Sequence, residues 1–199
     1  NASSFTALRT LNSINRNLDI AQDRVSTGLR VTSALYNSSS FVVAQGLRSE
    51  LKAIGAVSQG LNNSKGVGNV GIAGATGISD LMGDVRAKLT ELSNEGITTS
   101  QRTILLNDFN ALVSQAASFV ANASFNGVNL LTGATNINTL SNLAGGTLSL
   151  TAATNVGVQI RSIAGATIGT ATNAQSVIAG QFSNVQSVVN AALCTLGAE

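Results

Sequence analysis

The sequence predicts a mainly α protein, an elongated bundle of long antiparallel helices with heptad patterning and a small β-hairpin insert. Three observations predict it. Apolar residues recur at alternating spacings of three and four in four long segments, the 199 residues include no proline, and one Asn-, Gly- and Thr-rich region alternates apolar and polar residues instead. Steps of three and four place apolar side chains on one helix stripe, a step of two suits a strand, and helices without proline run uninterrupted.

The first predicted helix covers roughly the first thirty residues. Its apolar stripe, which we name the seam, follows the a/d pattern of a heptad, with the charged residues lying off it. The seam consists of Ala7, Leu11, Ile14, Leu18, Ala21, Val25 and Gly28. The segment Tyr36–Ser40 then breaks the pattern, and its Ser and Asn side chains can cap the start of a second helix.

The second predicted helix is long and contains a glycine-rich stretch. Its seam consists of Ala44, Leu47, Leu51, Ile54, Ser58 and Leu61, and resumes with Ile78, Leu81, Val85 and Leu92. Seven glycines occur from Gly55 to Gly77, each at a cost of up to about 1 kcal/mol relative to alanine. They indicate either a broken, flexible helix or, in the interpretation we prefer, a continuous helix whose small residues let another backbone approach closely.

Two further helices flank a region with strand-like periodicity. Ser93–Gly96 ends the second helix and Thr98–Gln101 opens the third, whose seam consists of Leu105, Phe109, Leu112, Ala116, Phe119 and Ala123. In the polar, glycine-rich region that follows, the runs Thr147–Thr151 and Val156–Ile160 alternate apolar and polar residues, which predicts one or two β-hairpins. The last helix restores the seam with Ile178, Phe182, Val185, Val189, Ala192 and Leu196.

The composition excludes most enzyme chemistry. The chain has no His and a single Cys, Cys194, so an intramolecular disulfide, a Cys/His zinc site and a His-assisted nucleophile are all impossible. We therefore expect no enzymatic activity, no cofactor and no metal. The pairs Asp80 with Asp84 and Glu91 with Glu95 are interpreted as a solvated helix face, and the glycines of residues 66–71 as helical rather than as a dinucleotide-binding loop.

The charge distribution indicates a chain that associates with other protein chains. Only 10% of the residues are charged, the net charge is +2, and eighteen of the twenty charged residues lie between Arg9 and Asp108. A monomer kept soluble by its own charge would not usually leave half its length neutral. No basic cluster with interleaved aromatic residues predicts nucleic-acid binding, and polar residues interrupt every apolar run before it could span a membrane.

Two segments resemble bacterial flagellin, the subunit of the flagellar filament. They are the run Asp23, Arg24, Val25, Ser26, Thr27, Gly28, Leu29, Arg30 and Val31, and the run Phe125, Asn126, Gly127, Val128, Asn129, Leu130 and Leu131. The resemblance implies an N-terminal helical half of a rod domain at residues 1–131, a small variable outer region with β-hairpins at 132–172, and a C-terminal rod helix at 173–199. Relative to the family pattern, both termini are expected to be trimmed.

The resemblance also implies a function and partners. It implies self-association into a helical filament for motility, secretion to the bacterial flagellum at the cell surface, and flagellar export and capping proteins as partners. The seam residues Leu11, Ile14, Leu18, Val25, Leu47, Leu51, Leu105, Phe109, Leu112, Val185 and Val189 would then hold one subunit together. Exposed asparagines would meet neighbouring subunits, namely Asn62, Asn63, Asn107, Asn110 and Asn122.

These roles predict that Leu18→Asp melts the rod, whereas replacing Asn110 alters polymerisation without affecting folding. An alternative hypothesis is a cell-surface protein on the same scaffold that binds an acidic polysaccharide. This hypothesis rests on a set of basic residues along the first two helices, namely Arg9, Arg16, Arg24, Arg30, Arg48 and Lys52. Acidic residues are interspersed among them, so the field of this set would be weak.

Overall fold

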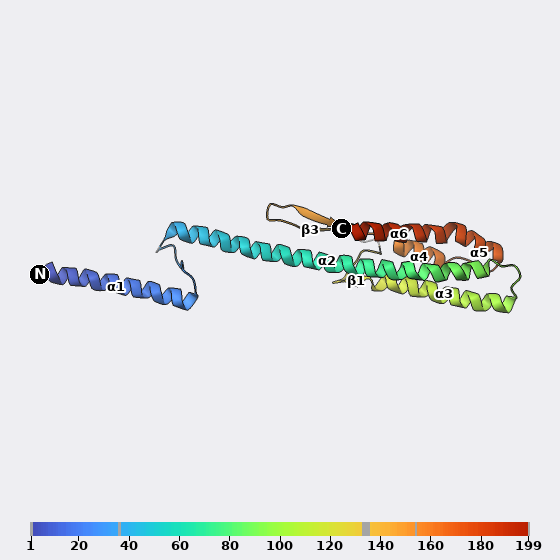
Figure 1. Ribbon diagram of the computed structural model, residues 1–199, viewed down its shortest axis with the longest axis horizontal. Helices are drawn as coiled ribbons and strands as arrows, with labels where there is room; N and C mark the ends of the chain where they lie inside the picture. Colours follow the sequence, from blue (N-terminus) through green and yellow to red (C-terminus); the bar gives the residue numbers. More distant parts are fainter. Residues whose placement is uncertain (1, 36, 133–135, 154, 199) are drawn as a thin grey trace. The chain divides into compact units, whose positions relative to one another are not determined.

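A computed structural model describes residues 2–35, 37–132, 136–153 and 155–198 of the chain (Figure 1). The fold is mainly α, with two small antiparallel strand pairs. The chain divides into two compact units, unit 1 at Asn1–Ala56 and unit 2 at Val57–Glu199. Each unit is described by itself.

Unit 1 consists of helix α1 (Ala2–Thr27), a loop and the first part of helix α2 (Ser38–Leu92). Helix α1 ends at Gly28, whose φ of +66° is the left-handed conformation that glycine adopts without steric cost. The capping predicted at the start of α2 is confirmed at Asn37, whose Oδ1 accepts a hydrogen bond from the Ser40 amide at 3.0 Å. Tyr36, which was included in that prediction, lies outside the described residues.

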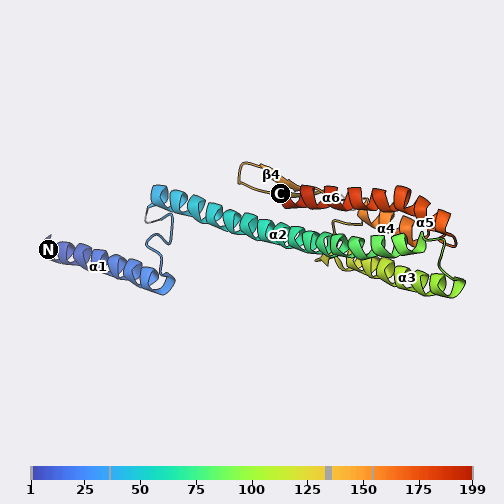
Figure 2. The same ribbon diagram turned by 45° about the vertical axis from the view of Figure 1, so that its right-hand side comes forward.

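Unit 2 is built around an antiparallel pair of helices. The rest of α2 and helix α3 (Thr99–Asn122) lie side by side after a reversal at residues 93–98 (Figures 1 and 2). A capping box starts α3, since the Thr98 hydroxyl accepts from the Gln101 amide and the Gln101 side chain accepts from the Thr98 amide. Arg102 fixes the reversal by donating hydrogen bonds to the carbonyls of Leu92 at 2.6 Å and Asn94 at 3.0 Å.

The remaining elements of unit 2 follow in the order strands, short helices and last helix. The strands are β1 (Ser124–Phe125), β2 (Val128–Asn129), β3 (Ile137–Leu140) and β4 (Thr147–Leu150), paired antiparallel as β1 with β2 and β3 with β4. Helices α4 (Val156–Ala164) and α5 (Ala171–Val177) follow, and a π-helical turn η1 (Ile178–Phe182) leads into α6 (Ser183–Ala198). The hairpin predicted at Thr147–Thr151 is therefore confirmed.

The strand predicted at Val156–Ile160 is wrong, because these residues begin α4. The alternation of the run also fits helical spacing, since Val156, Ile160 and Ile163 are separated by four and three residues and all three are buried. The predicted outer region at 132–172 is correspondingly divided. Its hairpin β3–β4 is an insert, whereas α4 contributes to the core; residues 133–135 and 154 of this region lie outside the described residues.

The core of unit 2 tests the predicted seams. In α6 the seam members Val185, Val189, Ala192 and Leu196 are all buried, as predicted. In α3 the buried residues are Phe109, Val113, Ala116 and Val120, so the predicted seam member Leu112 is only half-buried. The reason is that helix periodicity is closer to 3.6 than to 3.5 residues per turn, and a helix that packs on several partners does not need to hold a strict heptad.

The glycine-rich stretch of α2 is one continuous helix, which confirms the preferred interpretation. A Cβ atom on Gly74 would lie 2.7 Å from the Cβ of Ala123 at the end of α3, and one on Gly66 would lie 2.8 Å from the Phe125 ring. On Gly71 a Cβ would lie 3.4 Å from both Leu130 and Leu196. The glycines therefore form the side of α2 on which the β1–β2 segment and the ends of α3 and α6 pack closely.

Candidate interaction surface

The most unusual surface of the molecule is an apolar stripe in unit 1. Helix α1 has no buried residue in its described part, and Leu11, Leu18 and Val25 are 55%, 53% and 85% exposed. The stripe, which we name the unit 1 stripe, consists of Phe5, Leu8, Leu11, Ile14, Leu18 and Val25 on α1 and of Val43, Leu47, Leu51 and Ile54 on α2. Exposed apolar side chains gathered along one side of a helix, as on α1 and on the first part of α2, indicate an interaction site.

This stripe contains several residues of the seams predicted from the sequence. Leu11, Ile14, Leu18, Val25, Leu47 and Leu51 were expected to pack within the subunit. All six are exposed in the part of the chain that the structure describes, so their packing partner stays a prediction. Their heptad spacing identifies a face that buries apolar side chains against a helix, but spacing does not say whether that helix belongs to the same chain. The other predicted seam members do lie in unit 2, with Phe109, Val185 and Val189 buried and Leu105 and Leu112 half-buried.

Burying the side chains of this stripe against an apolar partner would be favourable. Fully burying one leucine-sized side chain stabilises by about 1.5–3 kcal/mol, and these side chains have already lost part of their exposure. About half of that stabilisation for each of several residues sums to more than the free energy of a weak contact. The ordering of side chains and the loss of translational and rotational freedom on association offset much of this gain. The arrangement therefore fits a binding surface for an apolar helix face.

The motif Asp23–Val31 forms the end of α1 and the loop that follows. The Thr27 hydroxyl donates to the Asp23 carbonyl at 2.6 Å, and the Leu29 amide donates to Thr27 Oγ1 at 3.3 Å. The loop is tied to α2 by the Arg48 guanidinium, which donates to the Val31 carbonyl at 3.3 Å. Within the motif the side chains of Asp23, Arg24, Ser26 and Arg30 are exposed, and Leu29 is 39% exposed.

The motif Phe125–Leu131 forms a clasp across the bundle. Asn126 and Gly127 make the tight turn between β1 and β2, with φ values of 49° and 78°, which is the pairing that a two-residue hairpin favours. The Asn126 side-chain amide donates to Asn63 Oδ1 on α2 at 2.6 Å, and that of Asn129 donates to the Val120 carbonyl on α3 at 2.6 Å. The motif thus joins α2 to the end of α3.

The contacts of the motif Phe125–Leu131 also involve a residue whose role could not be predicted from the sequence. Asn63 was expected to face a neighbouring subunit, but its side chain bonds Asn126 within the chain. Asn62, Asn107, Asn110 and Asn122 are exposed. No spacing rule connects positions 63 and 126, so the pairing could be found only from the folded chain.

Ion pairs in the described residues are centred on Lys88. Its Nζ lies 3.1 Å from Glu91 Oε2 and 3.6 Å from Asp108 Oδ2, which links α2 to α3. The hydrogen bond to Glu91 is the main reason that the pKa of Lys88 is raised above its ordinary value of 10.5. Desolvation lowers this pKa, and the charges of Glu91 and Asp108 raise it. The lysine therefore keeps its charge throughout the neutral range.

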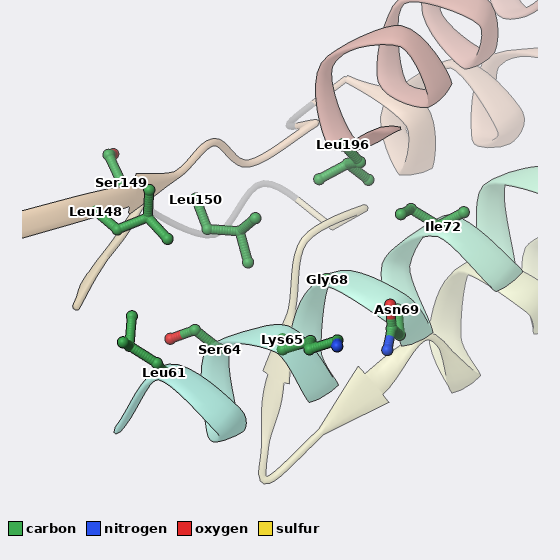
Figure 3. A pocket seen from close by; sticks show the side chains of 10 residues that line it. All are labelled: Leu61, Ser64, Lys65, Gly68, Asn69, Ile72, Leu148, Ser149, Leu150 and Leu196. Atoms are coloured by element: carbon green, nitrogen blue, oxygen red, sulfur yellow. The ribbon is translucent and has the colours of Figure 1, made fainter. Parts of the chain in front are cut away.

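An apolar cavity lies between α2, the β3–β4 hairpin and the end of α6 (Figure 3). Its volume is about 360 Å³, and Leu61, Ile72, Leu150 and Leu196 contribute much of its lining. The hairpin is held here by a hydrogen bond between the hydroxyls of Ser64 and Thr139. Among the described residues no group of three His, Cys, Asp or Glu could hold a metal ion, and Cys194 is exposed on α6.

None of the helices in the described ranges combines the length and apolarity that crossing a membrane requires.

The six basic residues proposed to bind an acidic polymer lie at several positions of unit 1. Arg24 and Arg30 line one cavity, Arg48 and Lys52 line another, and Arg9 and Arg16 lie along α1. Arg48 also donates a hydrogen bond to Val31, which lines the cavity of Arg24 and Arg30.

Comparison with known proteins relates the chain to one family. Residues 1–136 match the family model of the bacterial flagellin N-terminal helical region. A flagellin of Brucella melitensis is 33% identical over 135 residues, covering 68% of this chain and 47% of the relative. Flagellin FljN of Caulobacter vibrioides is 30% identical over 155 residues, covering 77% of this chain and 57% of the relative. The chain thus spans about half the length of the curated relatives it matches.

The fold is shared with a solved structure. The crystal structure of Bacillus cereus flagellin matches with a TM-score of 0.60 at 20% identity, covering 69% of this chain and 80% of that chain. At this identity the match concerns the backbone arrangement alone.

Proposed function

Because the chain belongs to the bacterial flagellin family, we propose that it is the rod-forming part of a subunit that self-associates into the helical flagellar filament. The subunit would be secreted and would act in motility at the cell surface. The observation that carries the proposal is the unit 1 stripe, in which Leu11, Ile14, Leu18 and Val25 follow heptad spacing and yet are exposed. A helical filament supplies a neighbour for such a stripe on every subunit.

The residue composition offers little support for a catalytic function, which favours the same proposal. The chain has no His, and its single Cys is exposed, so the stripe is best explained by assembly rather than by catalysis. Export and capping proteins of the flagellum belong to the proposal as partners, on the ground of family membership alone. We do not adopt the polysaccharide alternative, since acidic residues are interspersed among its basic residues in the sequence and weaken their electrostatic field.

The test uses the complete protein and a matched pair of α1 variants. Leu18→Asp places a charge on the stripe, and Asn17→Asp places the same charge one residue away, about 100° around the helix. Since Leu18 is 53% exposed, we expect both variants to fold, which replaces the sequence-based expectation that Leu18→Asp melts the rod. Only Leu18→Asp is expected to lose polymerisation, measured by light scattering and electron microscopy.

Circular dichroism melting of both variants is the control for folding. The proposal is wrong if the unchanged complete protein forms no filaments after concentration. It is also wrong if Leu18→Asp polymerises as readily as Asn17→Asp, because the stripe would then have no part in assembly.

A further inference from the structure

The two units carry net charges of opposite sign. Unit 1 has six basic and three acidic residues, a net charge of +3, whereas unit 2 has five basic and six acidic residues, a net charge of −1. On the premise that the chain assembles as proposed above, we propose that a cationic cavity in unit 1 of one copy binds an acidic face of α2 in unit 2 of a second copy. This assigns a specific contact within the assembly.

The cationic cavity lies where α1, the loop and the start of α2 meet. It has a volume of about 330 Å³ and is lined by Arg24, Arg30, Val31, Thr32, Asn37 and Ser40. Both arginines are exposed, and neither has an ion pair or hydrogen bond with another part of the described chain. No carboxylate lines the cavity. A guanidinium presents five N–H donors in a planar fork. Two guanidinium groups beside hydroxyl and amide groups therefore suit the binding of carboxylates.

The acidic face of α2 consists of Asp80, Asp84 and Glu91, with Ala87 between them. Steps of four, three and four place these residues on one side of the helix, and all four are exposed. Lys88, four residues after Asp84 and so beside this face, pairs with Glu91 and Asp108, which leaves Asp80 and Asp84 without an ion pair among the described residues. Like charges four residues apart on a helix repel each other, so a cation brought to this face would relieve that repulsion.

The nearby basic residue Arg86 does not cover this face. It lines the groove between α2 and α6 together with Phe182 and Gln186, and residues two apart on a helix do not face each other. Asp80 and Asp84 are therefore the part of the acidic face that has no ion pair among the described residues. The cationic cavity of a second copy is its electrostatic complement.

The proposed contact is of the kind that builds open assemblies. Its two surfaces are different, so each copy uses one surface to bind the copy ahead and the other to bind the copy behind. Contacts of this heterologous type continue into filaments when their rotation does not close. Charge complementarity also fixes the register of two partners and excludes wrong ones, whereas apolar stripes alone are permissive.

The test reverses each surface in the complete protein. One variant carries Arg24→Glu and Arg30→Glu, and the other carries Asp80→Lys and Asp84→Lys. Each variant alone brings like charges together, so we expect its critical concentration for polymerisation to rise about tenfold or more. In an equimolar mixture each reversed surface meets its complement on the other variant. We therefore expect the mixture to polymerise near the concentration of the unchanged protein.

The outcomes separate this contact from the proposed function. If the unchanged protein forms filaments but the variants assemble normally, or if the mixture assembles no better than its components, the contact is wrong and the function stands. If a chain with all four substitutions assembles while the mixture does not, the charges pair within one molecule, which also overturns the contact. An unchanged protein that never polymerises overturns the function itself. Arg161→Glu, an exposed reversal on α4, is the control for charge alone.

Discussion

The close packing against the glycines of α2 gives a prediction that separates the cost of a steric contact from the gain in helix propensity. Gly74 and Gly83 both lie inside α2, but a Cβ on Gly74 would lie 2.7 Å from the Cβ of Ala123 and 3.0 Å from Leu131, whereas nothing lies within 4 Å of one on Gly83. In a helix interior, alanine is favoured over glycine by about 1 kcal/mol. Gly83→Ala should therefore stabilise the protein by about 1 kcal/mol.

Gly74→Ala gains the same helix propensity and loses packing. The atom it would meet belongs to a side chain without rotatable bonds, so the backbone of α3 must move, and overpacking of this kind typically costs about 1–3 kcal/mol. The net effect is a destabilisation of up to about 2 kcal/mol. The difference between the two variants equals the overpacking cost, because the propensity gain cancels.

The measurement is urea denaturation of both variants, followed by circular dichroism at 222 nm, a wavelength that reports helix content. The unchanged chain and Gly83→Ala are the references. Equal stabilisation of the two variants would refute the reasoning, because it would mean that α2 and the end of α3 are not in contact at Gly74.

Other predictions follow from single contacts. Arg102→Met removes two hydrogen bonds to the carbonyls of Leu92 and Asn94, and should destabilise unit 2 by about 1–3 kcal/mol and accelerate amide exchange at residues 93–98, with Arg86→Met as the control; unchanged exchange would contradict it. Gly127→Ala places a side chain at φ +78° and should cost about 1–2 kcal/mol, whereas Gly55→Ala, with open space around it, should not destabilise. Because its partners raise the pKa of Lys88 above 10.5, the stability that the pair contributes is present below pH 10.5 and is lost as pH rises through the raised pKa. Lys88→Met should therefore flatten the loss of thermal stability between pH 9 and pH 12, and an unchanged pH profile would show that the pair contributes nothing.

The periodicity of the sequence predicted the helices well because their burial is regular. The last helix shows this most clearly, since Val185, Val189, Ala192 and Leu196 were predicted from spacing and are buried together. The long helix α2 was likewise predicted through its glycines, because close approach explains small residues at helical spacing better than flexibility does. The capping residues at Thr98 and Gln101 could be identified because their chemistry is local.

Predictions failed where a pattern has two solutions or a partner is distant in sequence. The run Val156–Ile160 satisfies both strand and helix periodicity, and its burial against α3 and α6 decides for the helix. The stripe through Leu18 has the same spacing as a core seam, and this spacing leaves open whether its partner lies in the same chain or in another. The contact of Asn63 with Asn126 spans 63 residues, and nothing local indicates it.

The short reversal at residues 93–98 has a consequence for the order in which the chain folds. Contacts between adjacent elements form early, since closing a short loop costs little conformational entropy. Helices α2 and α3 are adjacent in this sense, whereas α6 begins at Ser183 and must return from the far end of the sequence to reach Gly71 through Leu196. During synthesis the helical hairpin can therefore form while the side later covered by α6 is still open. Closing the core of unit 2 is then a late step, made when the last helix arrives.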